Sequence, residues 1–154
     1  MITTSNINSA LVKRLENLGI LITKDIKNVQ PPSLYIKYIA SNSTEVANAT
    51  SQLRYSFGIY YFSDKQTFLD LTTREKELKK ELKKPLKVEY TNDNEDDKKI
   101  KILDISSIEF DFNEDDYVLN CIINFEFMLS DEVNNRYDDE YNNEEIMDEL
   151  EISY

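Results

Sequence analysis

The sequence contains no histidine and no tryptophan, and it has one cysteine, two glycines and three prolines in 154 residues. Without histidine, the usual general base at neutral pH and the commonest transition-metal ligand are absent. A single cysteine excludes an intrachain disulfide and, without histidine, a Cys/His zinc site. Two glycines are too few for a phosphate-binding loop or a dinucleotide fingerprint. We therefore predict a protein that is not an enzyme and needs no cofactor.

Carboxylates are the remaining source of chemistry. Two acidic clusters have residue types that can bind Ca²⁺ or Mg²⁺: Asp93, Glu95, Asp96 and Asp97 in the first, and Asp111, Glu114, Asp115 and Asp116 in the second. Neither cluster has the central glycine and closing glutamate of a calcium-binding loop. We interpret both as solvated turns and predict no metal site. Nothing in the sequence indicates the carboxylate pair that a glycosidase holds across its cleft.

Long apolar runs are also missing. No run reaches the about 18 residues of a membrane-spanning helix, and the first residues lack the charged start and apolar core of a signal peptide. We therefore expect synthesis in the cytoplasm and no membrane partner. Cys121 is followed by Ile122 and Ile123, which favours a buried thiol over a reactive one.

Negative charge is abundant and unevenly distributed. The net charge is −12, and residues 131–154 hold ten acidic residues against one basic residue. Binding nucleic acid directly needs a basic surface, so the natural partners are basic proteins. We expect a domain over 1–130 and an acidic C-terminal arm over 131–154. The arm's apolar residues are candidates for docking on a partner, with a purely solubilising role as the alternative: Ile146, Met147, Leu150, Ile152 and Tyr154.

The first half of the chain predicts a helix and a hairpin. Apolar residues spaced by four, four and three predict a helix over residues 5–18 that ends at Gly19. After two consecutive prolines, aromatic and β-branched residues predict strands over Ser33–Ala40 and Leu53–Phe62. The polar stretch Ser41–Gln52 between them has no apolar period, so we expect a loop.

The second half predicts a helix and further strands. Ser63 and Gln66 fit a capping box that starts a helix running to about Lys84. Strands are then predicted over Leu86–Tyr90, over 99–112 with a break near Ser106-Ser107, and over Tyr117–Leu129. The order helix-strand-strand-helix-strand-strand predicts an α+β domain, with an antiparallel sheet of about four strands and two helices on one face.

Three segments and their surroundings resemble a known family. They are "ENLG" (Glu16 to Gly19), "PPSLYIKYI" (Pro31 to Ile39) and "RYSFGIYYF" (Arg54 to Phe62), followed by a charged helix and a long closing hairpin. This succession, over roughly residues 1–130, resembles the tail terminator (collar) proteins of phage tails. It is most similar to the small terminators of contractile tails in defective prophages and phage-tail-like bacteriocins.

The resemblance implies a structural function and no catalysis. Such proteins form a hexameric ring on the head-proximal end of the completed tail tube, where the ring stops tube polymerisation and anchors the last sheath layer. The implied partners are further copies of the chain, the tube protein, the sheath protein and, in phages, the head–neck connector. The implied location is the host bacterial cytoplasm during assembly, and then the particle itself.

A cyclic ring needs two different surfaces that match each other. Lysines crowd the end of the second predicted helix, where the helix dipole favours cations even without a partner. As an alternative to a solvated helix end, we hypothesise that they face a neighbour's acidic turn: Lys79, Lys80, Lys83 and Lys84 against Asp93, Glu95, Asp96 and Asp97. The stretch Ser41–Gln52 is a candidate contact with the tube, with a long hairpin connection of no further role as the alternative. The arm is a candidate contact with a ring neighbour or the sheath.

The main alternative function is that of an acidic inhibitor, a decoy that imitates the charge of DNA and binds a basic protein. The net charge of −12 invites this hypothesis. However, imitation needs carboxylates fixed at the spacing of phosphates, whereas this chain concentrates its acidic residues in a terminal arm. We therefore favour the structural role.

Overall fold

The computed structural model describes residues 2–47, 50–91 and 97–130. Its helices are α1 (Thr4–Leu15) and α2 (Phe68–Leu82), with short 3-10 helices at Glu16–Leu18 and Ile26–Asn28. Its strands are β1 (Leu21–Thr23), β2 (Ser33–Ala47), β3 (Thr50–Phe62), β4 (Leu86–Thr91), β5 (Lys98–Leu103), β6 (Ile105–Asn113) and β7 (Val118–Ser130). The predicted α+β class with two helices is confirmed, but the described residues form more strands than predicted.

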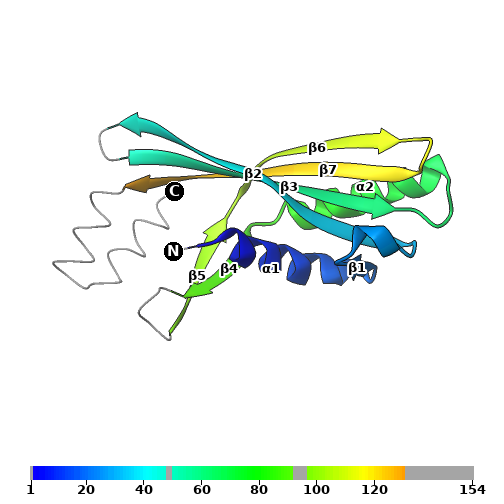
Figure 1. Ribbon diagram of the computed structural model, residues 1–154, viewed down its shortest axis with the longest axis horizontal. Coiled ribbons are helices and arrows are strands. Elements are labelled where there is room, and N and C mark those ends of the chain that lie inside the picture. The colour runs from blue at the N-terminus through cyan, green and yellow to red at the C-terminus, as the bar shows by residue number, and fades with distance from the viewer. Residues whose placement is uncertain (1, 48–49, 92–96, 131–154) are drawn as a thin grey trace.

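The strands form two sheets. One has five strands in the order β1-β2-β3-β7-β6, and β4 pairs with β5 in a separate two-stranded ribbon. β1 runs parallel to β2, and the other pairings are antiparallel. In Figure 1 the β4–β5 ribbon crosses below the large sheet at the end where β7 finishes. The predicted single antiparallel sheet is therefore wrong in strand count and topology.

One face of the large sheet carries the core. Alternate side chains of β3 and β7 are buried there, as expected for strands covered on one side: Phe57, Ile59, Tyr61, Leu119, Cys121, Ile123 and Phe125. The helices add Ile7, Leu11 and Leu15 from α1 and Leu71, Leu78 and Leu82 from α2. All of these side chains belong to one contiguous cluster. The opposite face of the sheet is not covered by the helices.

The predicted loop over Ser41–Gln52 is wrong, because its described residues, 41–47 and 50–52, belong to β2 and β3 and form the outer part of their hairpin. Backbone pairing between the strands continues as far as Ala47 with Thr50, and β7 accompanies β3 to the same point, where Ser130 pairs with Thr50. The side chains of β2 from Ile39 to Ala47 are all exposed. Since neither face of the strand is buried here, no apolar alternation arises that could have revealed it.

The predicted capping box at Ser63 and Gln66 is also wrong. α2 begins at Phe68 and is capped by Thr67, whose hydroxyl oxygen accepts a hydrogen bond from the Asp70 N–H at 3.1 Å. Ser63 accepts from the Gln66 N–H at 3.2 Å, but Gln66 has a φ of 51°. A helix cannot run through this left-handed conformation. The Ser63 hydroxyl therefore belongs to the turn before the helix.

The predicted strand over 99–112 consists of two strands in different sheets. β5 ends at Leu103, β6 begins at Ile105, and the chain changes sheet at Asp104. The irregularity expected near Ser106-Ser107 is a register shift against β7 between Ile105 and Ser107. Alternating apolar residues predict a strand but do not identify its pairing partner. The change from one sheet to the other could therefore not be predicted from the sequence.

Candidate interaction surfaces

The described residues offer little to a chemical reaction. Cys121 is fully buried, and burial, with a smaller contribution from Glu75, raises the pKa of its thiol to about 12. The prediction of a buried thiol is therefore confirmed. Over 2–47, 50–91 and 97–130, no three or more His, Cys, Asp or Glu side chains are grouped so that they could hold a metal ion. None of the helices in these ranges has the length and apolar character to cross a membrane.

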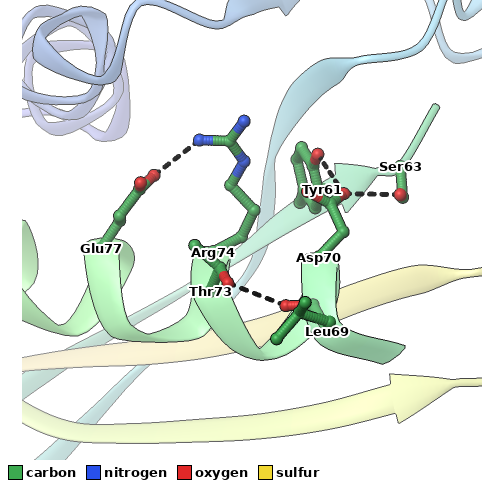
Figure 2. A network of polar contacts seen from close by, with 7 residues as sticks. All are labelled: Tyr61, Ser63, Leu69, Asp70, Thr73, Arg74 and Glu77. Carbon is green, nitrogen blue, oxygen red and sulfur yellow. Dashed lines mark hydrogen bonds and ion pairs between the residues drawn. The ribbon is translucent and has the colours of Figure 1, made fainter. Parts of the chain in front are cut away.

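A buried polar network joins the start of α2 to β3 (Figure 2). The hydroxyls of Tyr61 and Ser63 both donate to Oδ2 of Asp70 at 2.6 Å. Burial opposes ionisation of Asp70, but the two donors and the positive charge of Arg74 outweigh it and lower the pKa of the carboxyl group. The Arg74 guanidinium lies 5.3 Å from the centre of the Tyr61 ring and bonds to Glu77 at 2.7 Å. The contacts of Asp70 and Arg74 with Tyr61 fix the helix on the sheet, and the Arg74–Glu77 pair lies within the helix.

The β2–β3 hairpin extends past the helices at one end of the molecule (Figure 1). Its exposed side chains include Ile39 and Val46, with exposed fractions of 42% and 50%. β1 pairs only with residues Ser33–Tyr35 of β2, so beyond Tyr35 this edge of β2 has no strand partner among the described residues. An open strand edge with exposed apolar side chains suits binding to another protein. The described residues of the stretch predicted as a contact, 41–47 and 50–52, lie in this outer part of the hairpin.

The predicted lysine cluster lies at the C-terminal end of α2. All four of its members are exposed: Lys79, Lys80, Lys83 and Lys84. Lys79 also forms an ion pair with Glu75 at 3.5 Å, and its ammonium group lies 5.3 Å from the centre of the Phe110 ring. Lys79 is therefore held by contacts within α2 and with β6, although it remains exposed.

Arg14 of α1 holds this end of α2 in place. Its guanidinium donates to the backbone carbonyls of Glu81, Lys84 and Pro85 at 2.7, 3.1 and 2.6 Å. The last carbonyls of a helix have no partner within the helix, and a cation is favourable at this end of the dipole. The contact gives the exposed lysines a fixed position relative to α1.

One of the acidic residues predicted to pair with these lysines is described, and it lies at the other end of the β4–β5 ribbon. Asp97 is exposed directly before β5, whereas Asp93, Glu95 and Asp96 lie outside the described residues. β4 begins just after the lysines and has six residues, which span about 20 Å at about 3.3 Å per residue. The structure therefore does not bring the lysines and Asp97 together within one subunit.

The docking residues predicted in the arm lie outside the described residues: Ile146, Met147, Leu150, Ile152 and Tyr154. β7 ends at Ser130. Near that end, the Lys101 ammonium group of β5 lies 4.4 Å from the centre of the Phe127 ring of β7. The last described strand therefore contacts β5 near its C-terminal end.

β5 carries a feature that the sequence did not reveal, because its isoleucines face outward and its lysines inward. Ile100 and Ile102 have exposed fractions of 56% and 49%, against 9% and 3% for Lys99 and Lys101. A sequence that alternates lysine and isoleucine does not state which set faces the core. The buried Leu103 on the lysine side of the strand is the one signal that could have decided it. Exposed apolar side chains on a strand that buries charge are typical of a binding surface.

These features define a class of protein that acts through its surfaces: a compact α+β body with a projecting hairpin, charged ends and exposed apolar residues. The sequence profile described as phage tail terminator protein matches residues 4–137. The match begins with α1 and passes the end of β7, and the chain belongs to the phage tail terminator family. The predicted resemblance is thereby confirmed, and with it a structural role in phage tails. No curated protein matches the chain.

Proposed function

We propose that this protein forms a ring that caps the head-proximal end of a phage-type tail tube, ends tube polymerisation and anchors the last layer of sheath. Its partners are further copies of itself, in a hexamer, the tube protein, the sheath protein and, where a head is present, the connector. The observation that carries the proposal is the projecting β2–β3 hairpin of a tail terminator family member. A subunit that stops a polymer must bind the growing end without offering a surface to which the next polymer subunit can bind.

The hairpin tip is the proposed contact with the tube, and it can be removed without touching the core. Thr44 and Gln52 are register partners, so an Asn-Gly turn in place of residues 45–51 closes the shortened hairpin in a favoured geometry. We expect this variant to remain folded and form rings but to leave tubes uncapped, so that purified tube protein polymerises to greater lengths in its presence than with the natural chain. Electron microscopy of tube lengths gives the measurement.

A matched control is the double substitution of Ile26 and Lys27 by Ser, at an exposed 3-10 turn away from the tip. It should cap tubes as the natural chain does. Normal capping by the shortened hairpin would exclude the tip as the tube contact. A protein that scatters light as a monomer or dimer and binds a basic partner would instead support the inhibitor function.

The ring contact proposed here joins the lysine end of α2 in one subunit to the acidic stretch 93–97 of the next subunit. Two surfaces of opposite charge on one subunit are suited to a heterologous contact. In the assembled particle, the arm over 131–154 is the proposed link to a ring neighbour or the sheath. Particles made without residues 134–154 test this link, because normal sheath attachment in them would contradict it.

A further inference from the structure

A groove separates α1 from the β4–β5 ribbon. Its volume is about 370 Å³, and it is lined by the polar side of α1 and the outer face of β4, with Ile100 of β5 at its margin. The basic side chains around it are Lys13, Arg14 and Lys87, and the acidic one is Glu89. In a chain with a net charge of −12, this is a positively charged concavity.

The exposed isoleucines of β5 extend the groove with an apolar strip. Ile100 is the register partner of Glu89 and Ile102 that of Lys87, so both lie on the outer face that lines the groove. Exposing two isoleucines costs hydrophobic free energy that a polar residue would avoid. The surface therefore combines positive charge and apolar area, and its ligand should combine negative charge with apolar side chains.

Residues 131–154 of the same chain have this composition. They hold ten acidic residues and one basic residue, and near their end Leu150, Ile152 and Tyr154 alternate with Glu149 and Glu151. The segment starts at the end of β7, which packs on β5 through Phe127 and Lys101. Figure 1 shows the end of β7 and the ribbon at the same end of the molecule.

We propose that in the free subunit the chain's own arm docks in this groove, with its apolar residues on Ile100 and Ile102 and its carboxylates beside Lys13 and Lys87. Residues 131–145 can span up to about 50 Å, so the reach is ample. Tethering gives the arm an effective concentration on the order of mM, which a neighbour's arm cannot match in dilute solution. The proposal does not depend on the tail function, because it concerns the subunit before assembly.

The test uses the full chain with a nitroxide on Ser153→Cys. Cys121 is fully buried with a raised thiol pKa, so the label goes to the new thiol. With isotope-labelled isoleucine methyl groups, we expect the signals of Ile100 and Ile102 to be lost by paramagnetic broadening. Ile122, which is 38% exposed on the uncovered face of the large sheet, is the internal control and should keep its signal. Chemical reduction of the nitroxide supplies the reference spectrum.

Variants with reversed charges in the groove test whether the arm binds there or is only close to it by chance. Lys13 and Lys87 are exposed, so the K13E/K87E variant should fold, and its methyl spectrum verifies this. In this variant the signals of Ile100 and Ile102 should return. K37E changes an exposed lysine on the uncovered sheet face and should leave the broadening intact. Salt at 1 M, where the Debye length is about 3 Å, should also weaken the broadening.

Two results would overturn the inference. One is a spectrum in which Ile100 and Ile102 keep their signals, or in which Ile122 loses its signal equally. The other comes from a mixture at low concentration, in which the nitroxide and the isotope label are on different chains. Broadening of Ile100 in that mixture would show that the groove receives a second copy's arm. Broadening only when both labels share one chain supports the proposal.

Discussion

Asp70 is a buried carboxylate whose ionised form is stabilised by the fold. Its carboxylate accepts two hydrogen bonds and is 6% exposed. Asp70→Asn keeps the shape but removes the charge, and we expect a loss of about 1–3 kcal/mol in the free energy of unfolding at neutral pH, because the buried donors of Tyr61 and Ser63 lose part of their acceptor. Urea denaturation measures this loss. Asp64→Asn, at an exposed position in the preceding turn, should change stability by less than about 0.5 kcal/mol.

The pH dependence of that loss distinguishes the charge from the shape of Asp70. The folded protein holds the Asp70 pKa below its ordinary value of 3.8. The carboxylate therefore contributes stability that is complete above the unfolded pKa and is lost as the pH falls through the folded pKa. The stability difference between the natural chain and D70N should shrink below pH 3.8. A difference that stayed constant down to pH 2 would mean that packing, and not charge, causes the effect.

At the scale of elements, Arg14 is the main polar link between α1 and the end of α2. Arg14→Ala removes three hydrogen bonds to backbone carbonyls, and we expect it to lower the free energy of unfolding by about 1–3 kcal/mol. Arg14→Lys should recover little of this, because a lysine ammonium cannot reproduce the planar fork of a guanidinium. Urea midpoints at an unchanged m-value give the comparison. Lys13→Ala serves as the neighbouring control, and natural stability in R14K would contradict the prediction.

Elements with local signals were predictable from the sequence. The stop at Gly19 was correct because its φ of 70° is one that glycine adopts freely. The strand over Tyr117–Leu129 was correct because one face of β7 is buried along most of its length. The outer part of β2 was missed because solvent contacts both of its faces, and it is held by backbone pairing with β3 and not by a buried apolar face. The start of α2 was missed because Gln66 adopts a left-handed conformation that no local pattern demands.

The candidate surfaces were predictable only in part, for a related reason. Charge clusters can be read directly, so the exposed lysines of α2 were found. Which side of a strand faces outward depends on its tertiary partners, so Ile100 and Ile102 were not found. The position of the lysines against α1 also required the long-range contact of Arg14.

At the scale of the whole molecule, the β4–β5 ribbon separates the lysines from a described acidic residue. The lysines precede β4, and Asp97 directly precedes β5 at the other end of the ribbon. Within one subunit the length of β4 keeps these charges about 20 Å apart. In the ring proposed above, each interface would pair the lysines of one subunit with the acidic stretch 93–97 of the next.

Charge exchange tests this arrangement. Lys80, Lys83 and Lys84 changed together to Glu should prevent ring formation at low salt, because each interface would oppose like charges. Asp93, Glu95, Asp96 and Asp97 changed together to Lys should do the same. A chain that carries both sets has opposite charges facing each other again, and we expect its rings to return. Mass photometry measures the ring fraction directly.

The combined variant is the decisive one, because misfolding explains a lost ring but not a recovered one. Single exposed ion pairs contribute only about 0.2–1 kcal/mol, but a closed ring repeats the contact at every interface, so reversal of three charges should shift assembly measurably. The recovered rings should lose stability as salt is raised. Rings that form equally well in all of these chains at low salt would show that the lysines are a solvated helix end, and the ring contact would then have to lie elsewhere on the subunit.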